Sequence, residues 1–168
     1  MFRNLKGYTL IELTVVIILI GLMMTMALPR LRYPMMTDNL KGATRKMIGT
    51  IRTIRDNALR EQSTYYLKFD LGSNRYWIDS PSMTQEERSV AREEASSLPA
   101  GVSIIDIWLK WDGKKVFGET EIRFNEKGYI RPSVIHIGAQ DGRRFTLVVS
   151  PFLGRVEVLE DYVDFEDI

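Results

Sequence analysis

With 168 residues, the chain has room for one globular domain and a short additional segment. Its formal net charge of +1 indicates no polyanionic partner, because proteins that bind nucleic acids usually carry a clear excess of Lys and Arg. The chain contains no cysteine. This excludes a disulfide framework, a thiolate metal site and a cysteine nucleophile.

The most unusual stretch is the apolar run over residues 7–29, whose only charged residue before its end is Glu12. As a helix rising about 1.5 Å per residue, residues 8–28 are long enough to cross a hydrocarbon core of about 30 Å. A carboxylate placed in such a core costs on the order of 3 kcal/mol, so Glu12 predicts a compensating partner. A plain anchor or a secretory signal peptide would explain the apolar run but not the acid.

The sequence Lys6-Gly7-Tyr8-Thr9-Leu10-Ile11-Glu12, followed by the apolar run, closely resembles the signature of type IV pilins and type II secretion pseudopilins. The resemblance implies that a dedicated prepilin peptidase cuts after Gly7 and that the new N-terminal residue, Tyr8, is N-methylated. It also implies that Glu12 pairs with the Tyr8 amine of a neighbouring subunit in the assembled filament. Two ions that are costly alone in lipid become tolerable as a well-placed pair.

The same resemblance implies how the chain is organised. Residues 1–7 would be a cleaved leader, residues 8–28 the transmembrane half of the N-terminal helix, and residues 29–62 its amphipathic periplasmic half. Residues 63–168 would form a β-rich globular domain in the periplasm, carried by a single-pass anchor in the bacterial inner membrane. Pro29 predicts a kink in the helix, because proline removes a backbone donor and clashes with the preceding turn.

From Asp38 to Gln62, apolar residues recur at spacings of three and four, which predicts an amphipathic helix with its apolar side against a sheet. This stripe consists of Leu40, Ala43, Met47, Ile51, Ile54 and Ala58. The basic residues that fall mostly off the stripe are Lys41, Arg45, Lys46, Arg52, Arg55 and Arg60. We interpret the basic side as a solvated face.

The remaining chain predicts β-structure. Aromatic-rich segments at 64–70 and 75–79 predict a hairpin, and the polar, charged segment 81–98 predicts a solvent-exposed insertion, either a short helix or a loop. Within it, Thr84-Gln85-Glu86-Glu87 resembles a capping box. Five further strands, most of them separated by glycine turns, are predicted at 102–109, 120–125, 133–137, 145–150 and 155–159. The predicted fold class is therefore α+β, a long N-terminal membrane-spanning helix followed by a small antiparallel β-sandwich, which is the pilin-like architecture.

Two segments, Phe124-Asn125-Glu126-Lys127-Gly128 and the run over residues 148–156, look like the C-terminal part of the H-type minor pseudopilin domain. This resemblance implies a structural subunit at or near the tip of the periplasmic pseudopilus of type II secretion. Such a subunit helps initiate assembly of the pseudopilus and export of folded proteins across the outer membrane. The implied partners are inner membrane lipid, the prepilin peptidase/N-methyltransferase, other minor pseudopilins, the major pseudopilin and secreted substrate proteins.

No catalytic, cofactor or metal motif is recognisable, and we predict that the chain is not an enzyme. The single histidine, His136, lies in an alternating run and predicts a half-buried structural side chain. Asp161, Asp164 and Asp167 have the spacing of one helical face, but no glycine turn supports a calcium loop. The acidic tail over residues 160–168 predicts a frayed, solvated terminus.

Two other functions remain open. A minor pilin of a type IV pilus, including the kind that binds DNA during uptake, would need a basic surface. The basic helix face, Arg143 and Arg144 are candidates for that surface, although the acidic tail opposes it. An unrelated single-pass, membrane-anchored binding module or enzyme could also carry an N-terminus that mimics the motif.

Overall fold

The computed structural model describes the backbone of residues 9–152 and 154–165, and the side chains of 9–24, 39–152 and 154–165. The chain forms two compact units, Met1–Met35 and Met36–Ile168. Helix α1, Leu10–Glu61, contributes to both units. The amphipathic helix predicted from Asp38 to Gln62 is thereby confirmed to within one residue at its C-terminal end.

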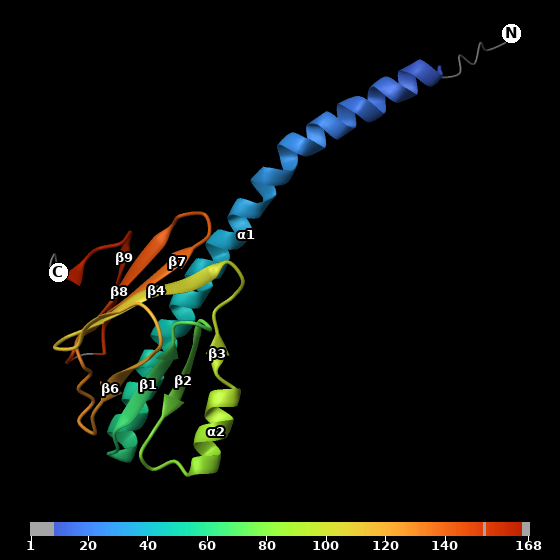
Figure 1. The fold of residues 1–168 in the computed structure, drawn as a ribbon. Helices are drawn as coiled ribbons and strands as arrows, with labels where there is room; N and C mark the ends of the chain where they lie inside the picture. Colours follow the sequence, from blue (N-terminus) through green and yellow to red (C-terminus); the bar gives the residue numbers. More distant parts are fainter. Residues whose placement is uncertain (1–8, 153, 166–168) are drawn as a thin grey trace, which may run out of the picture. The chain divides into compact units, whose positions relative to one another are not determined.

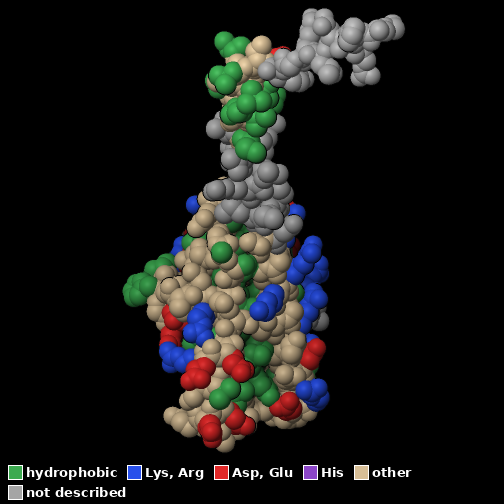
Figure 2. All heavy atoms as spheres, turned by 90° about the vertical axis from the view of Figure 1, so that its right-hand side faces the viewer, with side chains coloured by type: hydrophobic (Ala, Val, Ile, Leu, Met, Phe, Trp, Pro, Cys, Tyr) green, Lys and Arg blue, Asp and Glu red, His purple; other side chains and the backbone are tan. Residues whose placement is uncertain are grey.

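In the first unit, the apolar side chains that follow residue 9 are exposed to solvent on every side. Their exposed fractions range from 47% at Val16 to 87% at Leu10, and Figure 2 shows hydrophobic side chains covering this segment. Among the residues whose structure is described, no helix combines the length and apolar character needed to cross a bilayer. The predicted span over 8–28 extends at both ends beyond the described side chains, and so does Pro29, whose predicted kink stays a prediction.

In the second unit, the apolar stripe of α1 is completely covered. The stripe residues from Leu40 to Ala58 have exposed fractions of 0% to 5% and share one hydrophobic core with residues of both sheets. Figure 1 shows strands β1 and β2 lying over this part of the helix. The predicted packing of the helix against a sheet is therefore confirmed.

Two antiparallel sheets make up the rest of this unit. Sheet A has the strand order β3-β2-β1-β6 and sheet B the order β5-β4-β7-β8-β9. Sheet A consists of β1 (Tyr65–Asp70), β2 (Arg75–Asp79), β3 (Ser96–Ser97) and β6 (Glu119–Phe124). Sheet B consists of β4 (Val102–Leu109), β5 (Gly113–Lys115), β7 (Ser133–Ala139), β8 (Arg144–Val149) and β9 (Val156–Glu160). Every strand predicted from the sequence is present, and the α+β class with antiparallel sheets is confirmed; the short strands β3 and β5 were not predicted.

Two glycine turns of the β-structure close directly against the last turns of α1. Gly128 and Gly154 have φ angles of 71° and 58°, in a backbone region that residues with a side chain rarely adopt. A Cβ atom at Gly128 would lie 2.8 Å from Cγ of Leu59, and one at Gly154 would overlap the side chain of Arg55. Glycine is therefore required at both turns for conformational and for steric reasons.

Candidate functional site

The predicted assembly site begins in the first turn of α1. The backbone N–H of Glu12 donates to the carbonyl oxygen of Thr9 at 3.1 Å and lies 3.4 Å from its hydroxyl oxygen. A carboxylate in the first turn is favoured by the helix dipole. No salt bridge to Glu12 occurs within the described part of the chain. Gly7 and Tyr8, the other predicted assembly residues, lie outside the described residues, so their geometry relative to Glu12 stays a prediction.

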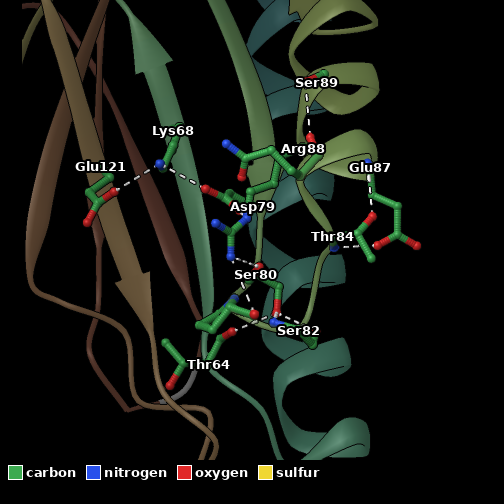
Figure 3. Close-up of polar contacts among 12 residues, drawn as sticks. Thr64, Lys68, Asp79, Ser80, Ser82, Thr84, Glu87, Arg88, Ser89 and Glu121 are labelled. Carbon is green, nitrogen blue, oxygen red and sulfur yellow. Dashed lines mark hydrogen bonds and ion pairs between the residues drawn. The ribbon is translucent and has the colours of Figure 1, made fainter.

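The outer face of sheet A carries a chain of ion pairs, drawn in Figure 3. Lys68 Nζ lies 2.8 Å from Oδ2 of Asp79 and 3.8 Å from Oε2 of Glu121. Arg88 Nε, from α2, lies 3.3 Å from Oδ1 of Asp79. The hydrogen bond to Asp79 raises the pKa of Lys68 above its ordinary value, and desolvation offsets only part of this effect.

Helix α2, Gln85–Glu93, is attached to the domain by polar contacts. It begins with the predicted capping box, in which Thr84 and Glu87 exchange side-chain and backbone hydrogen bonds, and it buries no residue. Besides the pair between Arg88 and Asp79, the guanidinium of Arg92 lies 5.4 Å from the ring centroid of Trp77. The segment predicted to be a solvent-exposed insertion is thus an exposed helix held by charge.

A cleft of about 380 Å³ lies near the turn between β4 and β5. Its lining residues are Trp111, Glu121, Arg123, Asn125, Tyr129 and Arg131. At the turn, Trp111 is 75% exposed and has a φ of 79°, which is unfavourable for a bulky residue. Arg131 holds the turn by donating to the carbonyl oxygen of Lys110 at 2.8 Å and pairing with Asp112 at 2.8 Å. Trp, Tyr and Arg are enriched among the residues that contribute most of the binding energy in protein–protein interfaces. The cleft therefore has the composition of a docking surface.

A row of polar residues crosses the outer face of sheet B. Asp106 of β4 is in register with His136 of β7, which is in register with Thr146 of β8. The row exists because β4 contains a bulge between Ile104 and Asp106. With strict alternation, Asp106 would share the core side of Ile104; the extra residue shifts the phase and turns Asp106 to the outer face.

Residues 161–165 of the C-terminal tail cover this row, so the expectation of a frayed terminus is wrong for these residues. The Thr146 hydroxyl donates to the carbonyl oxygen of Asp161 at 2.7 Å and accepts from the N–H of Val163 at 3.0 Å. Phe165 stacks on Trp108 with ring centroids 3.4 Å apart. As a consequence His136 has only 1% of its side chain exposed, not the half that its sequence pattern predicted. No group of three residues suited to binding a metal ion occurs in the described part of the chain.

The charge of Asp106 is set by its surroundings in this row. Burial by itself raises the pKa of the carboxyl group. The hydrogen bond and positive charge of His136, the hydrogen bond from Tyr162 and the positive charge of Lys114 outweigh burial, so the pKa of Asp106 lies below its ordinary value. Asp106 is therefore an anion held by three donors.

Comparisons with known proteins agree with the N-terminal motif and with the fold. The family profile described as the prokaryotic N-terminal methylation motif matches residues 2–28. The structure of the minor pseudopilin EpsH from the Type 2 Secretion System of Vibrio cholerae superposes with a TM-score of 0.52 at 11% sequence identity, covering 73% of this chain and 98% of EpsH. This chain has the pilin-like fold. A crystal structure of the same protein, EpsH of Vibrio cholerae, gives a TM-score of 0.53 at 12% identity, covering 76% of this pilin-like chain and 97% of EpsH.

Another similar structure, the type IV minor pilin FimU of Pseudomonas aeruginosa PAO1, has a TM-score of 0.49 at 12% identity and covers 73% of the pilin-like chain and 90% of FimU. No curated protein sequence matches the chain. The motif and the fold were both predicted from the sequence. The ion pairs under α2, the cleft at Trp111 and the row under the tail were not predicted, because their members lie far apart in sequence; the only local signal was an aromatic residue at a turn, in Trp111-Asp112-Gly113.

Proposed function

We propose that this chain is a minor pseudopilin of a type II secretion system. In this role it is a structural subunit at or near the tip of the periplasmic pseudopilus, helps initiate its assembly and supports export of folded proteins across the outer membrane. One combination of observations carries the proposal: the N-terminal methylation motif over residues 2–28 stands in front of a globular unit with the fold of a minor pseudopilin.

The exposed apolar surface of residues 9–24 supports a role for the first unit in lipid and in assembly. Each large apolar side chain there is at least 47% exposed. In the proposed precursor, residues 8–28 lie in the inner membrane, the leader over residues 1–7 is on the cytoplasmic side, and residues 63–168 face the periplasm. The proposed partners in the bilayer are lipid, the prepilin peptidase/N-methyltransferase and the helices of the other pseudopilins.

Processing creates the proposed ion pair. Cleavage after Gly7 releases the amine of Tyr8, and methylation leaves it able to carry a positive charge. The carboxylate of Glu12 in a neighbouring subunit pairs with this charged amine. A subunit out of register would leave both ions unpaired in lipid, which costs several kcal/mol per ion. The pair therefore contributes to the register of the filament as well as to its stability.

Processing is tested by mass spectrometry of the chain extracted from membranes of cells that contain a prepilin peptidase. The expected N-terminus is methylated Tyr8, and Gly7→Leu is expected to keep the full precursor. Gly21→Leu is the matched control, because a Cβ atom added at Gly21 has no atom within 4 Å. A native chain that still begins at Met1 would show that the motif is only a mimic and would leave an unrelated anchored module as the function.

Assembly is tested with Glu12→Ala. We expect normal cleavage but at least about tenfold less incorporation into cross-linked filaments, since one ion of a pair in lipid is lost. Thr14→Ala serves as a control two residues away, because the Thr14 hydroxyl donates back to the carbonyl oxygen of Leu10 within the same helix. Secretion at the normal rate by the Glu12→Ala strain would remove this mechanism.

A minor pilin of a type IV pilus is the second candidate, and one observation favours it. The side of α1 that faces solvent in the second unit exposes the cations Lys41, Arg45, Lys46, Arg52 and Arg60. Arg143, in contrast, is used internally, since its Nε lies 2.9 Å from Oδ2 of Asp141. A deletion strain separates the two candidates: loss of exoprotein secretion with normal pili supports the pseudopilin, whereas loss of pili or of DNA uptake supports the pilin.

A further inference from the structure

The buried histidine of sheet B has acceptors at both ring nitrogens. Nδ1 of His136 lies 2.6 Å from Oδ1 of Asp106, and Nε2 lies 2.9 Å from the carbonyl oxygen of Val163. The side chains of His136 and Asp106 are 1% and 2% exposed. Water therefore has almost no access to either ring nitrogen. If both contacts are hydrogen bonds, the ring nitrogens have to supply both protons.

The number of N–H donors that the two contacts require gives the charge of the His136 ring. A neutral imidazole carries one N–H and one lone pair, and a backbone carbonyl only accepts. Asp106 is held as a carboxylate because its Oδ2 accepts from the Tyr162 hydroxyl at 3.1 Å and lies 3.5 Å from Nζ of Lys114. Both contacts of His136 can be hydrogen bonds only when both ring nitrogens carry a proton.

The contact with Val163 is one of the attachments of the tail. Tyr162 stacks on the His136 ring at 4.0 Å between centroids, and Thr146 binds the tail backbone on either side of Tyr162. Val134, two positions from His136 on β7, is completely buried although it lies outside the core cluster around α1. The tail thus closes a second, smaller buried region on the outer face of sheet B.

We propose that residues 161–165 form a proton-dependent strap, which is shut over the outer face of sheet B while His136 carries two ring protons and loosens when it loses one. After that loss, a ring lone pair faces either the Asp106 carboxylate or the Val163 carbonyl oxygen, and one hydrogen bond becomes a repulsion. The strap is therefore tighter at low pH and looser at high pH. Opening would uncover Trp108 and Val134.

The other charged or titratable groups around the ring do not reverse this direction. Among the described residues, those in contact with the ring or with its partners are Asp106 on β4, Lys114 on β5, Arg144 on β8 and Tyr162 in the tail itself. Lys114 donates to the Tyr162 hydroxyl, which raises the pKa of Lys114 above its ordinary value. Lys114 thus keeps its charge where imidazoles titrate, between about pH 5 and about pH 8.

Hydrogen exchange of the full chain in detergent tests the strap. Exchange of the C-terminal peptide is measured by mass spectrometry from about pH 5.5 to about pH 8.5 and corrected for the intrinsic pH dependence of exchange. We expect protection of residues 161–165 to fall about tenfold over this range, the size expected when one charge-assisted hydrogen bond is lost. Protection of β1, in the core of sheet A, should stay constant.

Two variants complete the test. His136→Gln has no titrating ring and should show weaker protection of the tail that no longer depends on pH. Glu157→Gln changes an exposed charge on the neighbouring strand β9 and should keep the pH dependence. Tail protection that is constant with pH in the native chain, or that retains its pH dependence in His136→Gln, would overturn the proposal.

A spectroscopic measurement decides the matter even if His136→Gln does not fold. The chain has a single histidine, so the ring-nitrogen resonances of ¹⁵N-histidine-labelled protein belong to His136 alone. Two protonated ring nitrogens are expected wherever the tail is protected, and loss of one should coincide with loss of protection. A neutral ring under a fully protected tail would contradict the inference.

Discussion

The two parts of α1 have the same secondary structure and opposite surroundings. From Leu10 to residue 24 the large apolar side chains are about half exposed or more, whereas from Leu40 to Ala58 the stripe residues are at most 5% exposed. The sequence pattern accounts for the difference. The first part is apolar on all sides, as in a membrane helix, and the second is apolar on one side only, as in a helix that packs on a soluble core.

This contrast shows where each part of the helix finds its stabilising contacts. The stripe from Leu40 to Ala58 is buried against the two sheets of its own chain. In the proposed function, the segment over residues 9–24 finds such contacts in lipid or in other subunits. Substitutions in the two parts should therefore be detected by different measurements, stability for the second part and assembly for the first.

The largest effect on stability is expected for Ile51→Ala. Ile51 is completely buried, so truncation should lower the free energy of unfolding of the globular unit by about 2 to 5 kcal/mol. Ile17→Ala removes the same atoms from a side chain that is 62% exposed and should leave that free energy unchanged. Urea denaturation followed by tryptophan fluorescence measures both; equal losses would mean that the two parts of α1 are not distinct.

Gly154→Ala should come next and lower the free energy of unfolding by about 3 kcal/mol. Alanine is unfavourable at the φ of Gly154, and its methyl group would also overlap the side chain of Arg55. Gly142→Ala is the matched control. Gly142 has a φ of 91° with no atom within 4 Å of a Cβ, so only backbone strain of about 1 kcal/mol is expected. The same denaturation experiment compares them, and similar losses would show that the fit of this turn against α1 adds nothing.

Asp106→Asn should lower stability near neutral pH by about 2 kcal/mol, since it removes the anion between His136, Tyr162 and Lys114. The folded pKa of Asp106 is depressed, so its contribution is present above the unfolded pKa of about 3.9 and is lost as pH falls through the folded value. Acid titration of stability in the native chain and in Asp106→Asn tests this. The variant should lose less stability below about pH 4, and an identical acid profile would contradict the assignment.

The smallest effect is expected for Trp111→Gly. Trp111 is an exposed aromatic residue of the globular unit, and in this respect it resembles the first part of α1. Glycine relieves the unfavourable φ of 79°, so stability should change by less than about 1 kcal/mol and in the stabilising direction. A decrease in the free energy of unfolding above about 2 kcal/mol would mean that Trp111 stabilises the packing of the domain and is not merely an exposed residue lining the cleft.

Sequence patterns were most informative where an element depends on neighbours along the chain. The periodicity of Leu40 to Ala58 located the amphipathic helix, Thr84 and Glu87 located the start of α2, and alternation located the main strands. The prediction for His136 was wrong on burial, and the prediction of a frayed tail was wrong for residues 161–165, which are attached to sheet B. Alternation along β7 gave no information about a segment some 27 positions away that lies over its outer face.

By itself, the sequence determined the N-terminal motif, the helix with its two kinds of surface and the order of the strands, because each of these follows from chemistry repeated over a few residues. Only the tertiary structure decided which side of sheet B Asp106 would face. A single extra residue in β4 reverses the alternation of side chains, and its position is set by pairing with β7. The bulge places the carboxylate beneath the tail, where His136 connects the two.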